Sequence, residues 1–130
     1  MKIFLDDCRE PRQVKWMSMP LGPWKVVRNY EVFCRTVNGL YQRDGKLPQI
    51  ISFDHDLSVE DSIGFENSPH YVAVEKTGHD CAKWLVDFCI DRDIKLCDFQ
   101  CHSMNPAGKE NILGLLENFK RFQNETPADK

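Results

Sequence analysis

The feature that most constrains the fold is the alternation of short apolar segments with longer amphipathic ones. Four short segments have the composition of buried strands: 2–5, 24–28, 49–53 and one within 96–102. Three longer segments place apolar residues at helical spacing: 31–42, 79–91 and one that begins near Pro106. Strands that alternate with helices predict an α/β domain whose parallel sheet carries helices on both faces.

The size and composition of the chain suit one globular domain. Its 130 residues, 42% of them hydrophobic and 28% charged, are enough for a single core. We place the domain at residues 1–123 and expect residues 124–130, which lack apolar periodicity, to form a frayed tail. A net charge of −3 argues against a general electrostatic grip on nucleic acid, and no apolar run reaches the roughly 18–20 residues of a membrane span. We therefore expect a cytoplasmic protein that needs neither a membrane nor an obligate protein partner.

Six cysteines are many for this length, but the N-terminal segment has no apolar run like that of an export signal. Cys81 and Cys89 share an apolar helical face, which predicts reduced core cysteines rather than disulfides. A zinc site formed by Cys97, Cys101 and His102 is a weaker alternative, because the chain contains no CxxC pair.

Polar side chains follow three of the four predicted strands, at the point where each strand ends. They are Asp6 and Asp7 after the first strand, Asp54, His55 and Asp56 after the third, and His102, Ser103 and Asn105 after the fourth. Parallel sheets bind their ligands at the carboxyl ends of the strands, near the point where the strand order reverses. The sequence therefore predicts one site at this edge of the sheet.

The carboxylates at this edge predict a metal site. Asp6, Asp7 and Asp54 would repel one another, and a hard divalent cation such as Mg²⁺ (or Mn²⁺) relieves that repulsion while keeping waters that a phosphate can replace. The alternative for Asp6 and Asp7 is ordinary turn chemistry, since aspartate is common where a strand ends.

The two histidines are candidates for proton transfer. An imidazole exchanges protons near neutral pH, so His55 and His102 are suited to act as general base and general acid. If the strand alternation continues, Asp54 and Asp56 share a face and His55 turns away, so His102 is the stronger candidate. The alternative for both is a structural histidine held by hydrogen bonds.

Three further side chains are candidates for phosphate binding. Arg9 can grip a phosphate with two N–H groups, and Ser103 and Asn105 precede the amides that open the last helix. For Asn105 the alternative is helix capping alone. Basic residues interleaved with Trp16 and Trp24 could also receive a single-stranded nucleic-acid end, although buried tryptophans would give the same pattern.

Two more segments call for interpretation. Thr77 and Asp80 precede an apolar-periodic run at capping-box spacing, which we favour over a His79–Asp80 metal pair. Residues 57–76 form a long connection of the kind that often serves as a lid or binding loop.

Four motifs together resemble the cyclic-phosphate-processing receiver-like family, a relative of response-regulator receiver domains. The resemblance covers about residues 1–122, and its motifs are LDDCREP at 5–11, ISFDHDL at 51–57, TGHDCAKWL at 77–85 and CHSMNPAGKENI at 101–112. It implies a three-layer, receiver-like (flavodoxin-like) α/β fold with about four parallel strands in the order 2-1-3-4.

The resemblance also implies roles for individual residues. By position Asp6 and Asp7 resemble the acidic pair that binds Mg²⁺ in receivers, Asp54 resembles the aspartate that accepts phosphate, and Ser103 resembles the hydroxyl residue after the fourth strand. The chain departs from receivers because no fifth strand with a terminal lysine follows residue 102, which argues against an ordinary phosphorelay.

These observations lead to a metal-dependent phosphoesterase that opens a cyclic phosphate, such as a 2′,3′-cyclic phosphate on a nucleotide or an RNA end. Two alternatives stay open. Asp54 and Asp56 also resemble the nucleophile and acid/base pair of haloacid-dehalogenase phosphatases, which react through a phospho-aspartate. The other alternative is a non-catalytic receiver-like module that binds a phosphorylated ligand or a protein partner.

Overall fold

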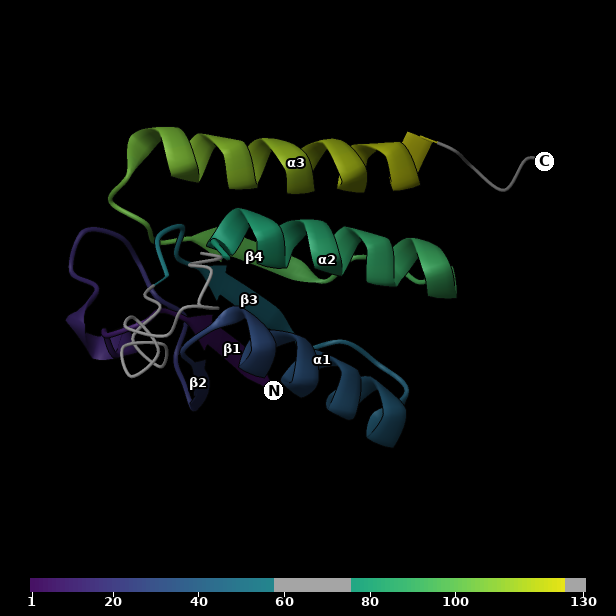
Figure 1. Ribbon diagram of the computed structural model, residues 1–130, viewed down its shortest axis with the longest axis horizontal. Helices are drawn as coiled ribbons and strands as arrows, with labels where there is room; N and C mark the ends of the chain where they lie inside the picture. Colours follow the sequence, from purple (N-terminus) through teal and green to yellow (C-terminus); the bar gives the residue numbers. More distant parts are fainter. Residues whose placement is uncertain (58–75, 126–130) are drawn as a thin grey trace, which may run out of the picture.

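The computed structural model describes residues 1–57 and 76–125 (Figure 1). The three predicted helices and four predicted strands are all present, joined by one short 3₁₀ helix that was not predicted. In chain order the elements are β1 (Lys2–Leu5), η1 (Pro11–Gln13), β2 (Trp24–Val27), α1 (Tyr30–Asp44), β3 (Ile50–Phe53), α2 (Gly78–Arg92), β4 (Asp98–Cys101) and α3 (Pro106–Glu125). Nearly all of the predicted binding loop at 57–76 lies outside the described residues.

The four strands form one parallel sheet in the order β2-β1-β3-β4, as predicted. In the register of the sheet, Phe4 of β1 lies between Val26 of β2 and Ser52 of β3, and Ser52 lies beside Gln100 of β4. The strand order reverses between β1 and β3, because β1 connects outward to β2 while β3 connects the other way to β4. In open parallel sheets this is the place where ligands bind.

The prediction of helices on both faces of the sheet is wrong. Parallel crossovers are right-handed, so α1 and α2, which both lead in the direction of β4, must cover the same face. Helix α3 packs against α2, and Figure 1 shows all three helices on one side of the sheet. The β1–β2 connection leads the opposite way and therefore crosses the other face, but it contains only the short helix η1. The third layer is thus a coil, residues 6–23, rather than a layer of α-helices.

The face under the helices is apolar at its centre. Ile3 and Leu5 of β1 and Ile51 and Phe53 of β3 are fully buried there. They belong to one core with helix residues that include Phe33, Val37, Leu85, Ile112 and Leu116. Both α1 and α2 are well capped: Asn29 accepts from the Val32 N–H, and Thr77 and Asp80 form the predicted capping box.

The face under the 6–23 coil buries polar groups as well as apolar ones. Strand alternation places Phe4, Ser52, Gln100 and the following His102 on this face, and Phe4 stacks on the His102 ring with centroids 4.3 Å apart. The coil is attached through side chains, since Trp16 Nε1 donates to the His102 carbonyl (3.0 Å). Hydrogen bonds rather than helix packing therefore hold this layer in place.

No helix within residues 1–57 and 76–125 is both long enough and apolar enough to span a bilayer.

Candidate functional site

Asp6, Asp54 and His102 each directly follow the last residue of a strand, namely β1, β3 and β4. The backbone N–H of Asp6 donates to Val27 O (3.1 Å), that of Asp54 to Leu5 O (3.0 Å) and that of His102 to Phe53 O (2.9 Å). Each lies two residues after a strand residue on the coil-covered face, so all three side chains start on that face. They are buried side by side at the carboxyl edge.

Asp6 accepts hydrogen bonds from both the neighbouring backbone and His102. Its Oδ1 accepts the backbone N–H groups of Cys8 (2.9 Å) and Arg9 (2.8 Å), and its Oδ2 lies 3.0 Å from His102 Nε2. Burial on its own would raise the pKa of Asp6, but the His102 hydrogen bond, the two backbone donors and the Arg9 charge outweigh burial and hold that pKa well below its ordinary value. Asp6 is therefore a carboxylate whose oxygens are already occupied by donors of the chain.

The partners of His102 determine its tautomer. Gln100 Nε2 donates to Ser52 Oγ (3.1 Å), so the Ser52 hydroxyl hydrogen is left to donate to His102 Nδ1 (2.7 Å). A carboxylate only accepts, so we assign the ring proton to Nε2, where it donates to Asp6. In this arrangement both nitrogens of a fully buried ring are engaged.

Asp54 is the second buried carboxyl, and its environment shifts its pKa in the opposite direction to that of Asp6. It accepts one hydrogen bond from a backbone N–H, that of His55 (2.9 Å). Burial, together with the nearby negative charge of Asp6, raises the pKa of Asp54 to about 6. This side chain is therefore the one whose charge a bound cation would stabilise most.

Two helix starts hold the Asp54–Asp56 segment in place. The Gly78 N–H donates to His55 O (2.7 Å), and a Cβ at Gly78 would lie 1.7 Å from Asp54 O. A Cβ at Gly108 would lie 2.3 Å from Cγ of the His55 ring. Only glycine permits α2 and α3 to approach this segment so closely.

One pocket of about 520 Å³ opens at this edge of the sheet. Six of the nine predicted site residues line it: Asp7, Arg9, Asp54, Asp56, Ser103 and Asn105. In Figure 1 the strand arrows end beside the start of α3 and the coil that follows β1, which is where these residues come from.

The other three predicted residues do not line the pocket. Asp6 and His102 are buried behind it, and the His55 ring packs against Gly108 while its Nδ1 donates to Asp56 (2.9 Å). The strand ends at Phe53, so the alternation that would turn His55 away from Asp54 and Asp56 does not continue, and the His55 ring instead hydrogen-bonds with Asp56. Direct proton transfer from either histidine to a ligand finds no support in these positions.

Arg9 lies at the boundary between the pocket and the buried group. Its Nη1 is 3.4 Å from Asp6 Oδ2, an ion-pair distance, yet this buried nitrogen makes no hydrogen bond. An unsatisfied buried donor costs roughly 1–3 kcal/mol. Arg9 as a residue also lines the pocket, and its role in phosphate binding stays a prediction.

At the start of α3, two residues of the predicted anion site, Ser103 and Asn105, already take part in hydrogen bonds of the helix cap. Asn105 Oδ1 accepts the Gly108 N–H (3.0 Å), as expected for an N-cap, and the Asn105 N–H donates to Ser103 Oγ (3.1 Å). Asn105 Nδ2 reaches Asp56 Oδ2 (3.4 Å). The Ser103 hydroxyl keeps its own hydrogen, so Ser103 and Arg9 are the donors best placed for an anion.

A comparison with protein families identifies the domain. The model of the cyclic-phosphate processing receiver domain matches residues 1–118. The chain belongs to this family. The comparisons with curated proteins and with solved structures found no significant match.

In this receiver domain the donor set fits a divalent cation. Within the described residues, ligand atoms of Asp6, Asp54 and His102 lie within 4.8 Å of one another, and so do those of Asp6, Asp7 and Cys8. His102 Nε2 already carries a proton toward Asp6, which leaves the carboxylates as the candidate ligands: Asp7 and Asp54 line the pocket, and they belong to two different groups that share Asp6. Carboxylate oxygens are the ligands that Mg²⁺ and Mn²⁺ prefer.

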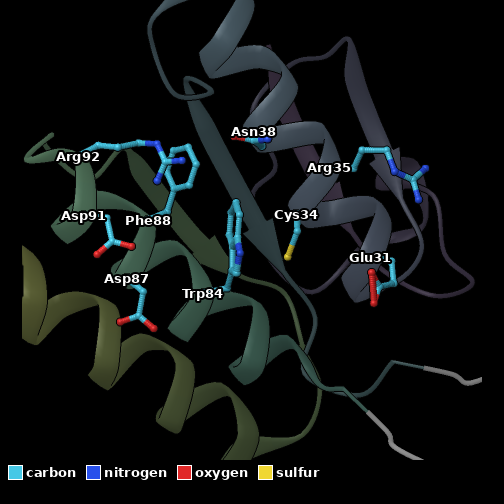
Figure 2. Close-up of a pocket in the computed structure, with 9 residues that line it drawn as sticks. All are labelled: Glu31, Cys34, Arg35, Asn38, Trp84, Asp87, Phe88, Asp91 and Arg92. Carbon is cyan, nitrogen blue, oxygen red and sulfur yellow. The ribbon is translucent and has the colours of Figure 1, made fainter.

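A second pocket lies away from the strand ends, in a groove between α1 and α2 (Figure 2). Trp84 and Phe88 of α2 form part of its wall, and Arg92 folds over the Phe88 ring at 3.7 Å. Its charged residues are of both signs, and no strand end contributes to it. The volume of this groove, about 540 Å³, is similar to that of the carboxyl-edge pocket, but the groove lies away from the carboxyl ends of the strands, where parallel sheets bind their ligands.

All six cysteines are free, as the sequence predicts. Burial raises the pKa of Cys34 and Cys89 to about 11 and that of Cys97 to about 12, so these thiols stay protonated at neutral pH. Cys97, Cys101 and His102 do not form a candidate metal group within the described residues.

One residue that shapes the site directly has no such role predicted from the sequence. Arg28, just after β2, donates through Nη1 to the Asp6 carbonyl (3.2 Å) and the Arg9 carbonyl (2.7 Å), and through Nη2 to Glu10 (2.6 Å). It thereby fixes the backbone that carries Asp7 and Arg9. The only signal in the sequence is a basic residue at the end of a strand that neighbours the acidic pair.

Proposed function

We propose that this receiver domain is a metal-dependent phosphoesterase that opens a cyclic phosphate carried by a nucleotide or an RNA end. The observation that supports it most is the pairing of opposite chemistries in one pocket. Carboxylates of Asp7 and Asp54 stand in the same pocket as the Arg9 guanidinium and the Ser103 hydroxyl. The first pair suits a cation and the second suits phosphate oxygens, so the pocket fits a metal-bound phosphate.

Each residue then has a defined part in the proposal. Asp7 and Asp54 hold the cation, and Arg9 and Ser103 hold phosphate oxygens. Asp6 and His102 are positioning residues, because they fix the backbone of Cys8 and Arg9 rather than reach the pocket. Mg²⁺ or Mn²⁺, when bound, supplies positive charge that polarises the phosphate and favours attack by water. Attack forms one P–O bond, breaks one ester P–O bond of the ring and leaves a phosphomonoester.

Asp56 is less suited to the acid/base role that a haloacid-dehalogenase mechanism would require. The hydrogen bond with His55, together with that from Asn105, lowers the pKa of Asp56 below its ordinary value. A general acid is most effective when its pKa lies near the working pH. We therefore favour attack by water over a phospho-aspartate on Asp54.

The test is a product assay with and without Mg²⁺ on 2′,3′-cyclic nucleotides, cyclic-ended RNA and a generic phosphomonoester. We expect Mg²⁺-dependent opening of the cyclic phosphate and a loss of at least about 100-fold in Asp54→Asn, because a group that holds transition-state charge is worth that much. Asp87→Asn, in the α1–α2 groove, is the matched control and should keep activity within twofold.

Three results would contradict the proposal, each in a different way. Full activity in Asp54→Asn would remove the metal role. A phospho-aspartate trapped by hydroxylamine would establish the covalent route. Saturable binding of the cyclic nucleotide without product, even with Mg²⁺ or Mn²⁺, would establish a non-catalytic binding module.

A further inference from the structure

The three tryptophans of the chain differ in their packing and in their exposure to solvent. Trp84 packs against Phe33 and Phe88 in the helix layer, and Trp24 packs edge-on against Phe4. Trp16 is 41% exposed, the most exposed of the three. Among the three tryptophans, Trp16 therefore offers the largest fraction of its side chain to a ligand.

Trp16 is exposed but held in one orientation. Its Nε1 donates to the carbonyl of His102 (3.0 Å), a fully buried residue of the Asp6 group. The guanidinium of Arg9 lies over the ring, with Cζ 5.2 Å from the ring centroid. Since Arg9 also lines the carboxyl-edge pocket, Trp16 stands one side chain away from that pocket.

Another exposed apolar side chain lines the pocket itself. Met104 lines the pocket and is 66% exposed. It follows His102, whose carbonyl holds Trp16, by two residues. Met104 at the rim of the charged pocket and Trp16 next to Arg9 suit a ligand with a flat apolar part next to its anionic part.

We infer that Trp16, together with Met104 at the pocket rim, forms a nucleobase-binding surface next to the phosphate pocket, so that the ligand is a nucleoside phosphate rather than a small alkyl phosphate. This inference rests on the proposed phosphate pocket and specifies its substrate. Aromatic side chains stack on any base, because every base has a π-face. Arg12 and Lys15, in the same coil, are exposed and supply positive charge for further phosphates of an RNA strand.

The test compares two ligands that share a phosphate but differ in the base. Adenosine 3′-phosphate and glycerol 2-phosphate are titrated in Mg²⁺ into the full chain, and the three indole N–H signals are followed by NMR. We expect adenosine 3′-phosphate to bind at least about fivefold more tightly and to shift the Trp16 signal, which is assigned by its loss in Trp16→Phe. Glycerol 2-phosphate should bind without that preference.

Two variants separate stacking from a merely structural role. Trp16→Phe keeps an aromatic face but loses the hydrogen bond to His102, so it should keep the preference for the nucleotide within about threefold. Trp16→Leu loses the aromatic face, so the two ligands should bind almost equally while glycerol 2-phosphate binds as before.

The inference is overturned if the wild type binds both ligands alike, or if Trp16→Leu keeps the preference. It is also overturned if Trp16→Phe loses as much as Trp16→Leu, since Trp16 would then act only by holding the His102 carbonyl. Failure of both ligands to bind the wild type would instead remove the phosphate pocket itself, and the base surface with it.

Discussion

The two faces of the sheet bury different chemistry, although they share the same four strands. The helix-covered face is apolar, with Ile3, Leu5, Ile51 and Phe53 at its centre. The coil-covered face buries Ser52 and His102 beside Phe4 and joins them by hydrogen bonds to Asp6. One face therefore supplies stability, and the other supplies a fixed arrangement of polar groups at the carboxyl edge.

The largest effect on stability should come from the helix face. Leu85 of α2 is fully buried in the apolar core, so Leu85→Ala should lower the free energy of unfolding by about 2–5 kcal/mol. Urea unfolding measures this loss. Because Leu85 does not contribute to the site, the affinity of the folded protein for Mg²⁺ should stay unchanged, and a parallel loss of affinity would contradict the separation of the two faces.

A smaller, pH-dependent effect should come from Asp54 on the coil face. Its pKa of about 6 lies above the ordinary 3.8, so its contribution to stability is present below pH 4 and is lost as the pH rises through 6. Without metal, Asp54→Asn should therefore stabilise the protein by roughly 2–3 kcal/mol above pH 7 and by almost nothing below pH 4.

Urea unfolding of both proteins between pH 4 and pH 8 measures this difference. Added Mg²⁺ should stabilise the wild type more than Asp54→Asn and so reduce the gap between them. A difference that stays constant across this pH range would show that Asp54 carries no electrostatic cost in the folded protein.

The Ser52 hydroxyl offers a finer test of the coil face. Ser52→Ala removes the donor to His102 Nδ1 and the acceptor of Gln100 Nε2, so we expect a loss of about 1–2 kcal/mol in the free energy of unfolding. In the wild type, ¹⁵N NMR should find the His102 proton on Nε2. A proton found on Nδ1 in the wild type would contradict the assigned network.

The smallest effect should come from Asp56, which is exposed at the mouth of the pocket. Asp56→Asn should change the rate of cyclic-phosphate opening by less than about threefold, because Asp56 is not required to transfer a proton in the proposed mechanism. Steady-state rates at pH 7 measure this change. A loss of 100-fold or more, typical of a removed general acid, would favour the haloacid-dehalogenase interpretation instead.

Much of the fold and part of the site follow from local patterns. The alternation of short apolar strands with amphipathic helices predicts the parallel sheet, and Thr77 and Asn105 predict two helix starts. Within a strand, successive side chains point to alternate faces. The same alternation pairs Phe4 with Asp6, Ser52 with Asp54 and Gln100 with His102, which is enough to place the three polar residues on one face.

Other parts depend on contacts between segments far apart in the sequence. The prolines at 11, 20 and 23 indicate a loop, but nothing local to residues 6–23 shows that this loop covers the second face of the sheet. Nothing near Arg28 shows that it reaches back to the Asp6 and Arg9 carbonyls. The roles of Gly78 and Gly108 arise because two helix starts meet the Asp54–Asp56 segment in the folded chain. The burial of His102 likewise depends on the coil that covers it.

In the proposed function, the carboxyl edge of the sheet, and not the α1–α2 groove, binds the cation. Mn²⁺ is paramagnetic and broadens the NMR signals of nearby nuclei, so one titration of ¹⁵N-labelled protein locates it. We expect substoichiometric Mn²⁺ to broaden the backbone amide signals of residues 6–9, 54–56 and 103–105 first. We expect Asp54→Asn to abolish this broadening. Broadening that begins instead around Glu31, Asp87 and Asp91 of the groove would contradict the proposed function.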